Sequence, residues 1–258
     1  MDVLFVISGF GVGVLVGLTG VGGGALMTPL LIFGFGVAPA VAVGTDLMFA
    51  AITKANGVWV HARQHSVEWR VVRWMLLGSL PASLITLLIL RQVDLQTGVA
   101  QDVMTTTLGL ALIVSAGALI FRHRLAQDDT GFAHDETGRK TQVATVLTGI
   151  VLGVLVTVTS VGAGALGAAV LFWLYPRMKA VRVVGTDLAH AVPLATVAGL
   201  GHWHLGTVDW ILLGSLLIGS LPGIYIGSRL SARVPEIWLR SVLAILLLGI
   251  GVRLVTVA

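Results

Sequence analysis

The chain has 258 residues, of which 56% are hydrophobic and only 11% are charged, and its mean hydropathy is +0.97. A soluble domain carries about 25% charged residues, so this composition excludes an ordinary water-exposed surface and predicts an all-α polytopic membrane protein. The net charge of +4 does not indicate a nucleic-acid partner, because the basic residues lie in short loops between apolar runs, where they set topology. The absence of cysteine excludes disulfides and thiolate sites, and no cofactor is expected.

The first half of the chain predicts five apolar segments. Two shorter runs, 3–19 and 25–36, are joined by a glycine-rich stretch, and three full-length runs follow at 39–60, 70–90 and 104–121. About 20 apolar residues are needed to cross the hydrocarbon core as a helix. We therefore expect residues 1–121 to form a first membrane repeat.

The second half predicts the same order of segments. Residues 122–142 are expected to be a cytoplasmic linker, and residues 143–258 a second membrane repeat. Its shorter runs are 143–159 and 165–175, and its full-length runs are 182–201, 210–228 and 240–257.

Four sequence landmarks recur in the same order in both halves. Gly9 through Leu26 matches the segment 140 residues later, and Gly44-Thr-Asp-Leu and Gly78-Ser-Leu-Pro match segments 141 residues later, as does Trp69. An ordered recurrence of this kind indicates a duplication.

The two halves are expected to have opposite orientations. Arg63, Arg70 and Arg73 follow the Gly44 span, whereas the matching stretch 202–214 has neither Lys nor Arg. Under the positive-inside rule, equivalent loops then face opposite sides of the membrane. This predicts two inverted-topology repeats, each a Gly-rich interrupted helix hairpin plus three transmembrane helices, an architecture common in secondary transporters. Both termini are expected outside the cytoplasmic (inner) membrane.

The glycine-rich stretches are candidate substrate sites. The runs after them are too short to span the membrane, so we expect half-helices whose N-termini point toward the midplane. Such termini bind anions through free N–H groups and the positive end of the helix dipole. The residues proposed to contact the substrate here are Thr19, Gly20, Gly22, Gly23, Gly24, Thr159, Ser160, Gly162 and Gly164. The alternative is close helix packing, because Gly9, Gly13 and Gly17, and the pair Gly20 and Gly24, also fit the small-xxx-small pattern.

Charged residues inside spans are functional candidates, since charge at membrane depth is costly. Asp46 and Asp187 are candidates for proton coupling, and Thr45 and Thr186 beside them for substrate binding. The alternative for these pairs is helix capping after a glycine. His190 lies on the same helix face as Asp187, and could relay protons or be a hydrogen-bonded structural histidine.

Lys54 is a candidate for balancing the charge of an anion, or for pairing with Asp46 eight residues earlier on about the same helix face, and Asn56 beside it is a further candidate ligand. Snorkelling is the alternative for the lysine. The second half has Ala195 in place of Lys54, so the site would be chemically asymmetric. No metal site is expected, because His61 and His65 lack an accompanying carboxylate motif, and these two and His202 and His204 are interpreted as interfacial residues.

Taken together, the twin glycine-rich openings and the paired Gly-Thr and Gly-Ser-Leu-Pro motifs resemble the TauE/SafE family of sulfite exporters over essentially the whole chain. The resemblance implies transport of sulfite, sulfonates or related small anions across the cytoplasmic membrane, with proton coupling.

We hypothesise a secondary active, proton-coupled transporter of a small anion such as sulfite or an organosulfonate. Its expected partners are that anion, protons, membrane lipid and, as a possible homo-oligomer, further copies of the chain. The alternative is a passive anion channel or uniporter of the same architecture. An intramembrane enzyme is disfavoured by the lack of H-E-x-x-H and G-x-S-x-G motifs, and an assembly subunit by the duplicated interrupted segments.

Overall fold

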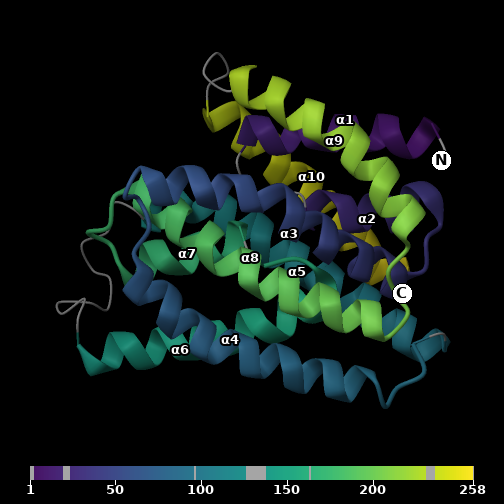
Figure 1. The fold of residues 1–258 in the computed structure, drawn as a ribbon, viewed down its shortest axis with the longest axis horizontal. Coiled ribbons are helices and arrows are strands. Elements are labelled where there is room, and N and C mark those ends of the chain that lie inside the picture. The colour runs from purple at the N-terminus through teal and green to yellow at the C-terminus, as the bar shows by residue number, and fades with distance from the viewer. Residues whose placement is uncertain are drawn as a thin grey trace.

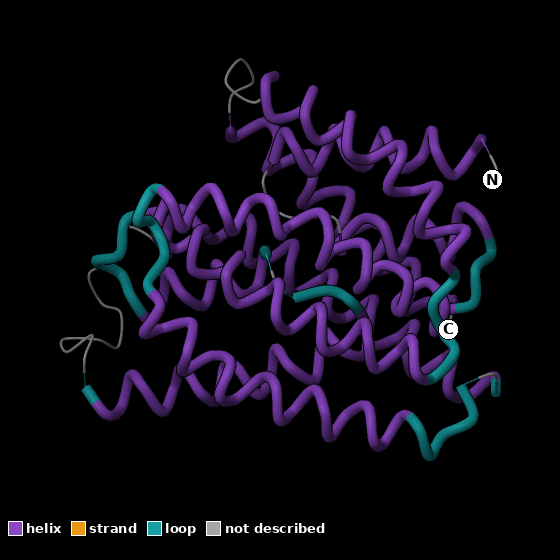
Figure 2. Tube along the Cα trace, viewed as in Figure 1, coloured by secondary structure: helices purple, strands orange, loops and turns teal. Residues whose placement is uncertain are grey.

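The computed structural model describes residues 3–19, 24–95, 97–125, 138–162, 164–230 and 236–257. These described residues are helices joined by short loops, without any β-strand (Figure 2). The helices are α1 (Val3–Thr19), α2 (Gly24–Phe35), α3 (Pro39–Arg63), α4 (Trp69–Leu90), α5 (Gly98–Leu125), α6 (Arg139–Thr159), α7 (Ala165–Leu174), α8 (Ala180–His204), α9 (Trp210–Leu230) and α10 (Glu236–Val257).

Among the described residues, five helices, α4, α5, α6, α8 and α9, are long and apolar enough to cross a membrane, by length and composition alone. This confirms a multi-pass helical membrane protein. The helices α2 and α7, with 12 and 10 residues, are too short to cross it. Both follow the glycine-rich stretches, as the sequence predicts.

The two central helices, α3 and α8, pack against each other and run in opposite directions (Figure 1). Near one end, the backbone N–H of Glu68, after α3, reaches Thr186 at the start of α8. Near the other end, the N–H of Asp209, after α8, reaches Thr45 at the start of α3. Each helix therefore ends beside the beginning of the other.

Positive charge gathers at the end of the molecule where α3 ends and α8 begins, which we call the basic end. Of the twelve Lys and Arg whose side chains are described, nine lie there: Arg63, Arg70, Arg73, Arg139, Lys140, Arg177, Lys179, Arg182 and Arg229. The opposite end holds Arg91 and Arg253, and both chain termini lie toward it (Figure 1).

The helices of the two halves are interleaved. In the main pairs, α1 packs against α9, α6 against α4, α5 against α10 and α3 against α8. Since α1 is the sequence counterpart of α6, and α9 of α4, exchanging the halves reproduces the same pairs. The duplication seen in sequence is thus matched by a duplication of packing.

Glycines allow the closest of these contacts. Side chains added at Gly9 and Gly13 of α1 would collide with the backbone of Leu216 and Ser220 on α9. In the second half, Gly149 of α6 faces the Met75 backbone of α4 in the same way. The packing interpretation of the α1 glycines is therefore confirmed, as small residues let helix backbones approach in a membrane.

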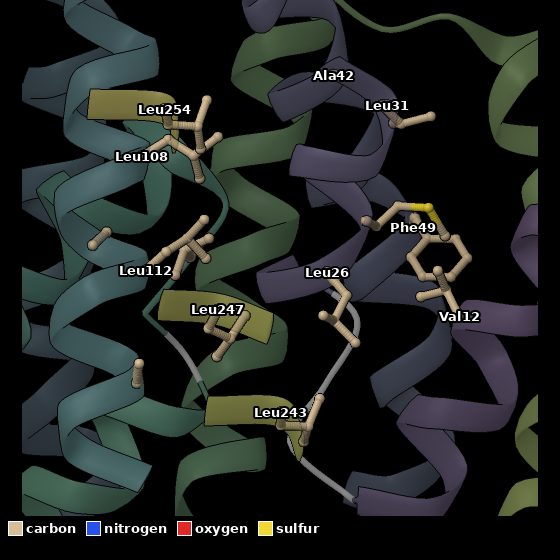
Figure 3. Packing of buried hydrophobic residues seen from close by; sticks show 14 of the residues in the cluster. Val12, Leu26, Leu31, Ala42, Phe49, Leu108, Leu112, Leu243, Leu247 and Leu254 are labelled. Carbon is tan, nitrogen blue, oxygen red and sulfur yellow. The ribbon is translucent and has the colours of Figure 1, made fainter. Parts of the chain in front are cut away.

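The largest apolar cluster of the described residues joins the two halves and lies between α1, α2, α3, α5, α9 and α10 (Figure 3). Phe49 of α3 is fully buried there, with Val12 and Leu26 nearby, and Leu112 packs in the same cluster with Leu247.

Two details of the expected architecture differ. Helix α6 begins at Arg139 and α5 extends to Leu125, so both ends of the predicted linker 122–142 are helical, and α6 with 21 residues is a full-length span. In addition, α1 packs chiefly against α9, although the rings of Phe5 in α1 and Phe35 in α2 are also in contact, with centroids 4.7 Å apart. The main partner of α1 lies in the other half of the chain, which periodicity cannot identify.

Candidate functional site

A cluster of ionisable side chains lies where α3 and α8 cross. Asp46 and Lys54 come from α3, and Asp187 and His190 from α8, and their exposed fractions are 0%, 8%, 3% and 0%. Charged side chains are almost never fully buried unless they interact with one another. The structure therefore brings together four residues that the sequence marks as functional.

Each carboxylate lies near the start of the short helix of its own half. The Thr28 hydroxyl of α2 donates to Asp46 Oδ2 at 2.5 Å. On the other side, Asp187 Oδ1 occupies the space that a side chain at Gly167 of α7 would need. The positive end of a helix dipole stabilises negative charge at this position. In both halves the short helix therefore lies next to the aspartate of the same half: α2 next to Asp46, and α7 next to Asp187.

Lys54 is the cation of this cluster and interacts electrostatically with both Asp187 and Asp46. It also acts on His190 through its charge. With both aspartates ionised and the histidine neutral, the cluster carries one net negative charge.

The glycine-rich segment of the second half has the backbone that glycine permits. Gly162 and Gly164 have φ angles of +134° and +130°, which side-chain-bearing residues rarely adopt. Ser160, at φ +59°, ends α6 in the left-handed conformation. Its buried hydroxyl lies close to the Asp46 carboxylate, but the two do not meet the geometry of a normal hydrogen bond.

Thr159 is already engaged within this segment. Its hydroxyl donates to the Leu155 carbonyl at 2.6 Å and accepts from the Val161 N–H at 3.1 Å. This stabilises the end of α6 and leaves Ser160 as the hydroxyl directed at the cluster.

The corresponding segment of the first half lies mostly outside the described residues. This applies to Gly20, Gly22 and Gly23 and to the side chain of Thr19, whereas Gly24 is the first residue of α2. Asn56 lies exposed on α3, outside the buried cluster.

His190 makes the site asymmetric. Its Nε2 lies 2.9 Å from Ser79 Oγ of α4. The matching residue of the first half is the apolar Phe49, just as Ala195 matches Lys54. The polar site therefore lies toward α4 and α8.

Three buried polar atoms of this site have no hydrogen-bond partner within the described protein: Asp46 Oδ1, Ser160 Oγ and His190 Nδ1. Native proteins rarely leave buried polar atoms unsatisfied, and such atoms mark a place for water, an ion or a functional role. No group of three or more His, Asp or Glu suited to a metal occurs in the described part of the chain. The arrangement can hold a small polar ligand and exchange protons.

Thr45 and Thr186 have a second role that spacing alone did not reveal. Their hydroxyls accept the backbone N–H groups of Asp209 and Glu68, each at 3.0 Å. Gly44 and Gly185, directly before them, leave room for the carbonyl groups of Thr207 and Ser66. These Gly-Thr pairs dock the loop that follows the opposite central helix.

Histidines close the same two loops. His61 Nδ1 lies 2.8 Å from Ser66 Oγ, and His202 Nδ1 lies 2.8 Å from Thr207 Oγ1. His202 is fully buried, and its Nε2 contacts the Thr157 carbonyl at 2.9 Å. It is therefore a structural histidine. The interfacial role that we expected from its position near the end of a span is wrong. The sequence did offer one indication of this role, because His202 matches His61 in the first repeat, 141 residues earlier.

Comparison with known proteins agrees with this picture. The sequence profile of the sulfite exporter TauE/SafE family matches residues 5–254. A Bacillus subtilis protein named "Probable membrane transporter protein YjnA" is 39% identical over 222 residues, covering 84% of this chain and 85% of the relative.

More distant relatives carry similar names. "Probable membrane transporter protein YdhB" of Bacillus subtilis is 24% identical over 83% of this chain and 84% of its own length. "Probable membrane transporter protein MJ0441" of Methanocaldococcus jannaschii is 28% identical over 76% of this chain and 70% of its own. No solved structure matches the chain significantly. The chain belongs to the TauE/SafE sulfite exporter family of membrane transporters.

Proposed function

We propose that this protein is a proton-coupled secondary transporter that moves a small anion, such as sulfite or an organosulfonate, across the cytoplasmic membrane. The buried cluster of Asp46, Lys54, Asp187 and His190 carries this proposal. Membership of a family described as sulfite exporters supports the choice of a small anion as substrate.

Charge balance is the argument for coupling. With two carboxylates and one lysine, the cluster is net negative and repels an anion. Placing one proton on a carboxylate makes the cluster neutral, so that Lys54 can attract the substrate, and this attraction is strong where water is scarce. Binding of the anion is then linked to binding of a proton.

Substrate contacts in this proposal come from groups of both halves. Ser160 and the segment around Gly162 and Gly164 border the cluster from the second half. The start of α2, at Gly24, and the stretch from Thr19 to Gly23 are proposed as their counterparts. Thr45, Thr159 and Thr186 shape the site by positioning backbone, and Asn56 is the weakest of the proposed ligands because of its exposure.

The proposal includes an inverted arrangement of the halves, with the basic end in the cytoplasm and both termini outside. It is supported by the antiparallel course of α3 and α8 and by the exchange-symmetric helix pairs. The excess of Lys and Arg at the basic end supports the orientation. Alternating access would expose the cluster first to one end and then to the other.

Replacing Lys54 with Met tests the charge-balancing role. We expect anion flux in proteoliposomes to be lost while membrane abundance is retained, because both carboxylates can accept protons when the lysine is absent. Ile52→Met, at an exposed position of the same helix that is not among the proposed ligands, is the matched control and should keep its flux. Undiminished flux in the Lys54→Met variant would disprove the role.

Neutralising one carboxylate tests coupling itself. Asp46→Asn and Asp187→Asn each imitate a permanently protonated site, so at least one of them should transport the anion without responding to a pH gradient. If both variants remain fully driven by the gradient, neither aspartate carries the coupling proton.

A further inference from the structure

A cavity of about 540 Å³ opens at the basic end of the molecule. It lies between the loop that follows α3 and the loop that precedes α8. Its polar lining consists of His65, Glu68, Arg70, Tyr175, Arg177, Lys179 and Arg182. Four of these side chains carry a positive charge, against one carboxylate.

The duplication provides an internal comparison. A cavity of about 570 Å³ at the opposite end is formed by the matching loops, at residues 38–41 and 205–207, together with the segment after α4. Its lining holds one cation, Arg91, and one carboxylate, Asp94. The two cavities have similar size and equivalent position, yet only the cavity at the basic end has a strong excess of positive charge.

A charged cavity with apolar walls focuses the electric field and raises the local concentration of oppositely charged solutes. Arg side chains also bind oxyanions through several N–H donors at once. From this contrast we propose that the cavity at the basic end is an outer binding site for a small oxyanion of the sulfite, sulfonate or phosphate type. The inference rests on the proposed function. It adds that the anion is captured most readily from the basic end of the molecule.

Glu68 connects this outer site to the central cluster. Its carboxylate pairs with Arg182 at 2.5 Å, and its backbone N–H binds the Thr186 hydroxyl. Thr186 directly precedes Asp187 of the central cluster. An oxyanion that contacts Arg182 competes with the Glu68 carboxylate, so occupation of the outer site acts on the loop that docks onto the start of α8.

The same chemistry is present in a dissolved anion and in the headgroup of an anionic lipid. The proposal is that the dissolved anion binds, because the cavity lies between loops at the end of the two central helices. Vesicles with and without anionic lipid separate the two sources.

The experiment compares Lys179→Gln with Lys140→Gln. Both lysines are exposed at the basic end, but only Lys179 lines the cavity. In phosphatidylcholine vesicles of determined protein orientation, Lys179→Gln should raise the KM for sulfite about two- to fivefold from the basic end. Its KM from the opposite end, and both values for Lys140→Gln, should match those of the unaltered protein.

Equal KM values for the two variants would overturn the proposal. An effect of Lys179→Gln that appears only when phosphatidylglycerol is added would assign the cavity to lipid headgroups and overturn the proposal of a dissolved ligand. Calorimetric titration of sulfite onto the protein in neutral detergent measures the binding affinity directly, so this test does not depend on transport. Weaker binding by Lys179→Gln alone supports the outer site even if no flux is found, whereas absence of flux counts only against the proposed function.

Discussion

Buried His202 allows a quantitative test of how the duplicated loops are held. The ring contacts the Thr157 carbonyl through Nε2 at 2.9 Å and the Thr207 hydroxyl through Nδ1 at 2.8 Å. Since a carbonyl can only accept, Nε2 carries the hydrogen, and in the neutral ring Nδ1 is an acceptor that shares the Thr207 hydroxyl hydrogen with the His202 backbone carbonyl. Thr157 is among the last residues of α6, whose terminal carbonyls lack partners within the helix. His202 therefore caps α6 from α8.

Replacing His202 with Leu removes both hydrogen bonds from a site with no solvent access. The loss of a buried hydrogen bond costs about 1 kcal/mol, and an unsatisfied buried partner costs about 1–3 kcal/mol. We therefore expect the free energy of unfolding to fall by about 2–4 kcal/mol.

His61 is the matched comparison in the first half. It makes the equivalent contact with Ser66 but is only partly buried. Water can replace this bond, so His61→Leu should cost about 1 kcal/mol. His202→Gln, which keeps a donor for the Thr157 carbonyl, should recover part of the loss.

The assay is unfolding of the purified variants in mixed micelles, followed by titration with a denaturing detergent. A markedly larger loss for His202→Leu than for His61→Leu is the expected result. Equal losses, or a stable His202→Leu variant that transports normally, would refute the capping role.

Three further predictions concern packing, the surface ion pair and the asymmetry of the site. Gly219→Leu should lower the free energy of unfolding by about 1–3 kcal/mol or more in the same assay, because the leucine side chain would overlap the α1 backbone. Gly214→Leu, on the same helix with open space around it, should be neutral or slightly stabilising. Glu68→Gln should change the free energy of unfolding by less than about 1 kcal/mol, since its ion pair is partly exposed. His190→Phe should keep its membrane abundance but lose about 1–3 kcal/mol in the unfolding assay, because the buried Ser79 hydroxyl loses its partner. It should also lose proton-driven flux, and retained flux would exclude His190 from the mechanism.

Hydropathy and the internal repeat were sufficient to predict most of the helices. The predicted full-length runs correspond to α3, α4, α5, α8, α9 and α10, and the short runs after the glycines correspond to α2 and α7. Hydropathy works here because a spanning helix must be apolar along its whole length. It fails for the partners of α1 and α2, because helices that are apolar on every side do not reveal which face is buried against which neighbour.

The candidate site was predictable for a different reason. Asp46, Lys54 and Asp187 stand out because charge inside a span is rare, and the structure brings them together. The docking role of Thr45 and Thr186 could not be predicted, since it depends on backbone N–H groups more than 100 residues away. Similarly, the burial of His202 depends on the end of α6, and a histidine near the end of a span has the same sequence signature when it lies at the membrane surface.

The central claim is that a proton accompanies the anion. The most direct test is sulfite flux into proteoliposomes that contain the purified protein, measured with and without an imposed pH gradient. Saturable flux that the gradient drives against the sulfite concentration difference is the predicted result. Flux that ignores the gradient would contradict proton coupling and identify a passive channel or uniporter.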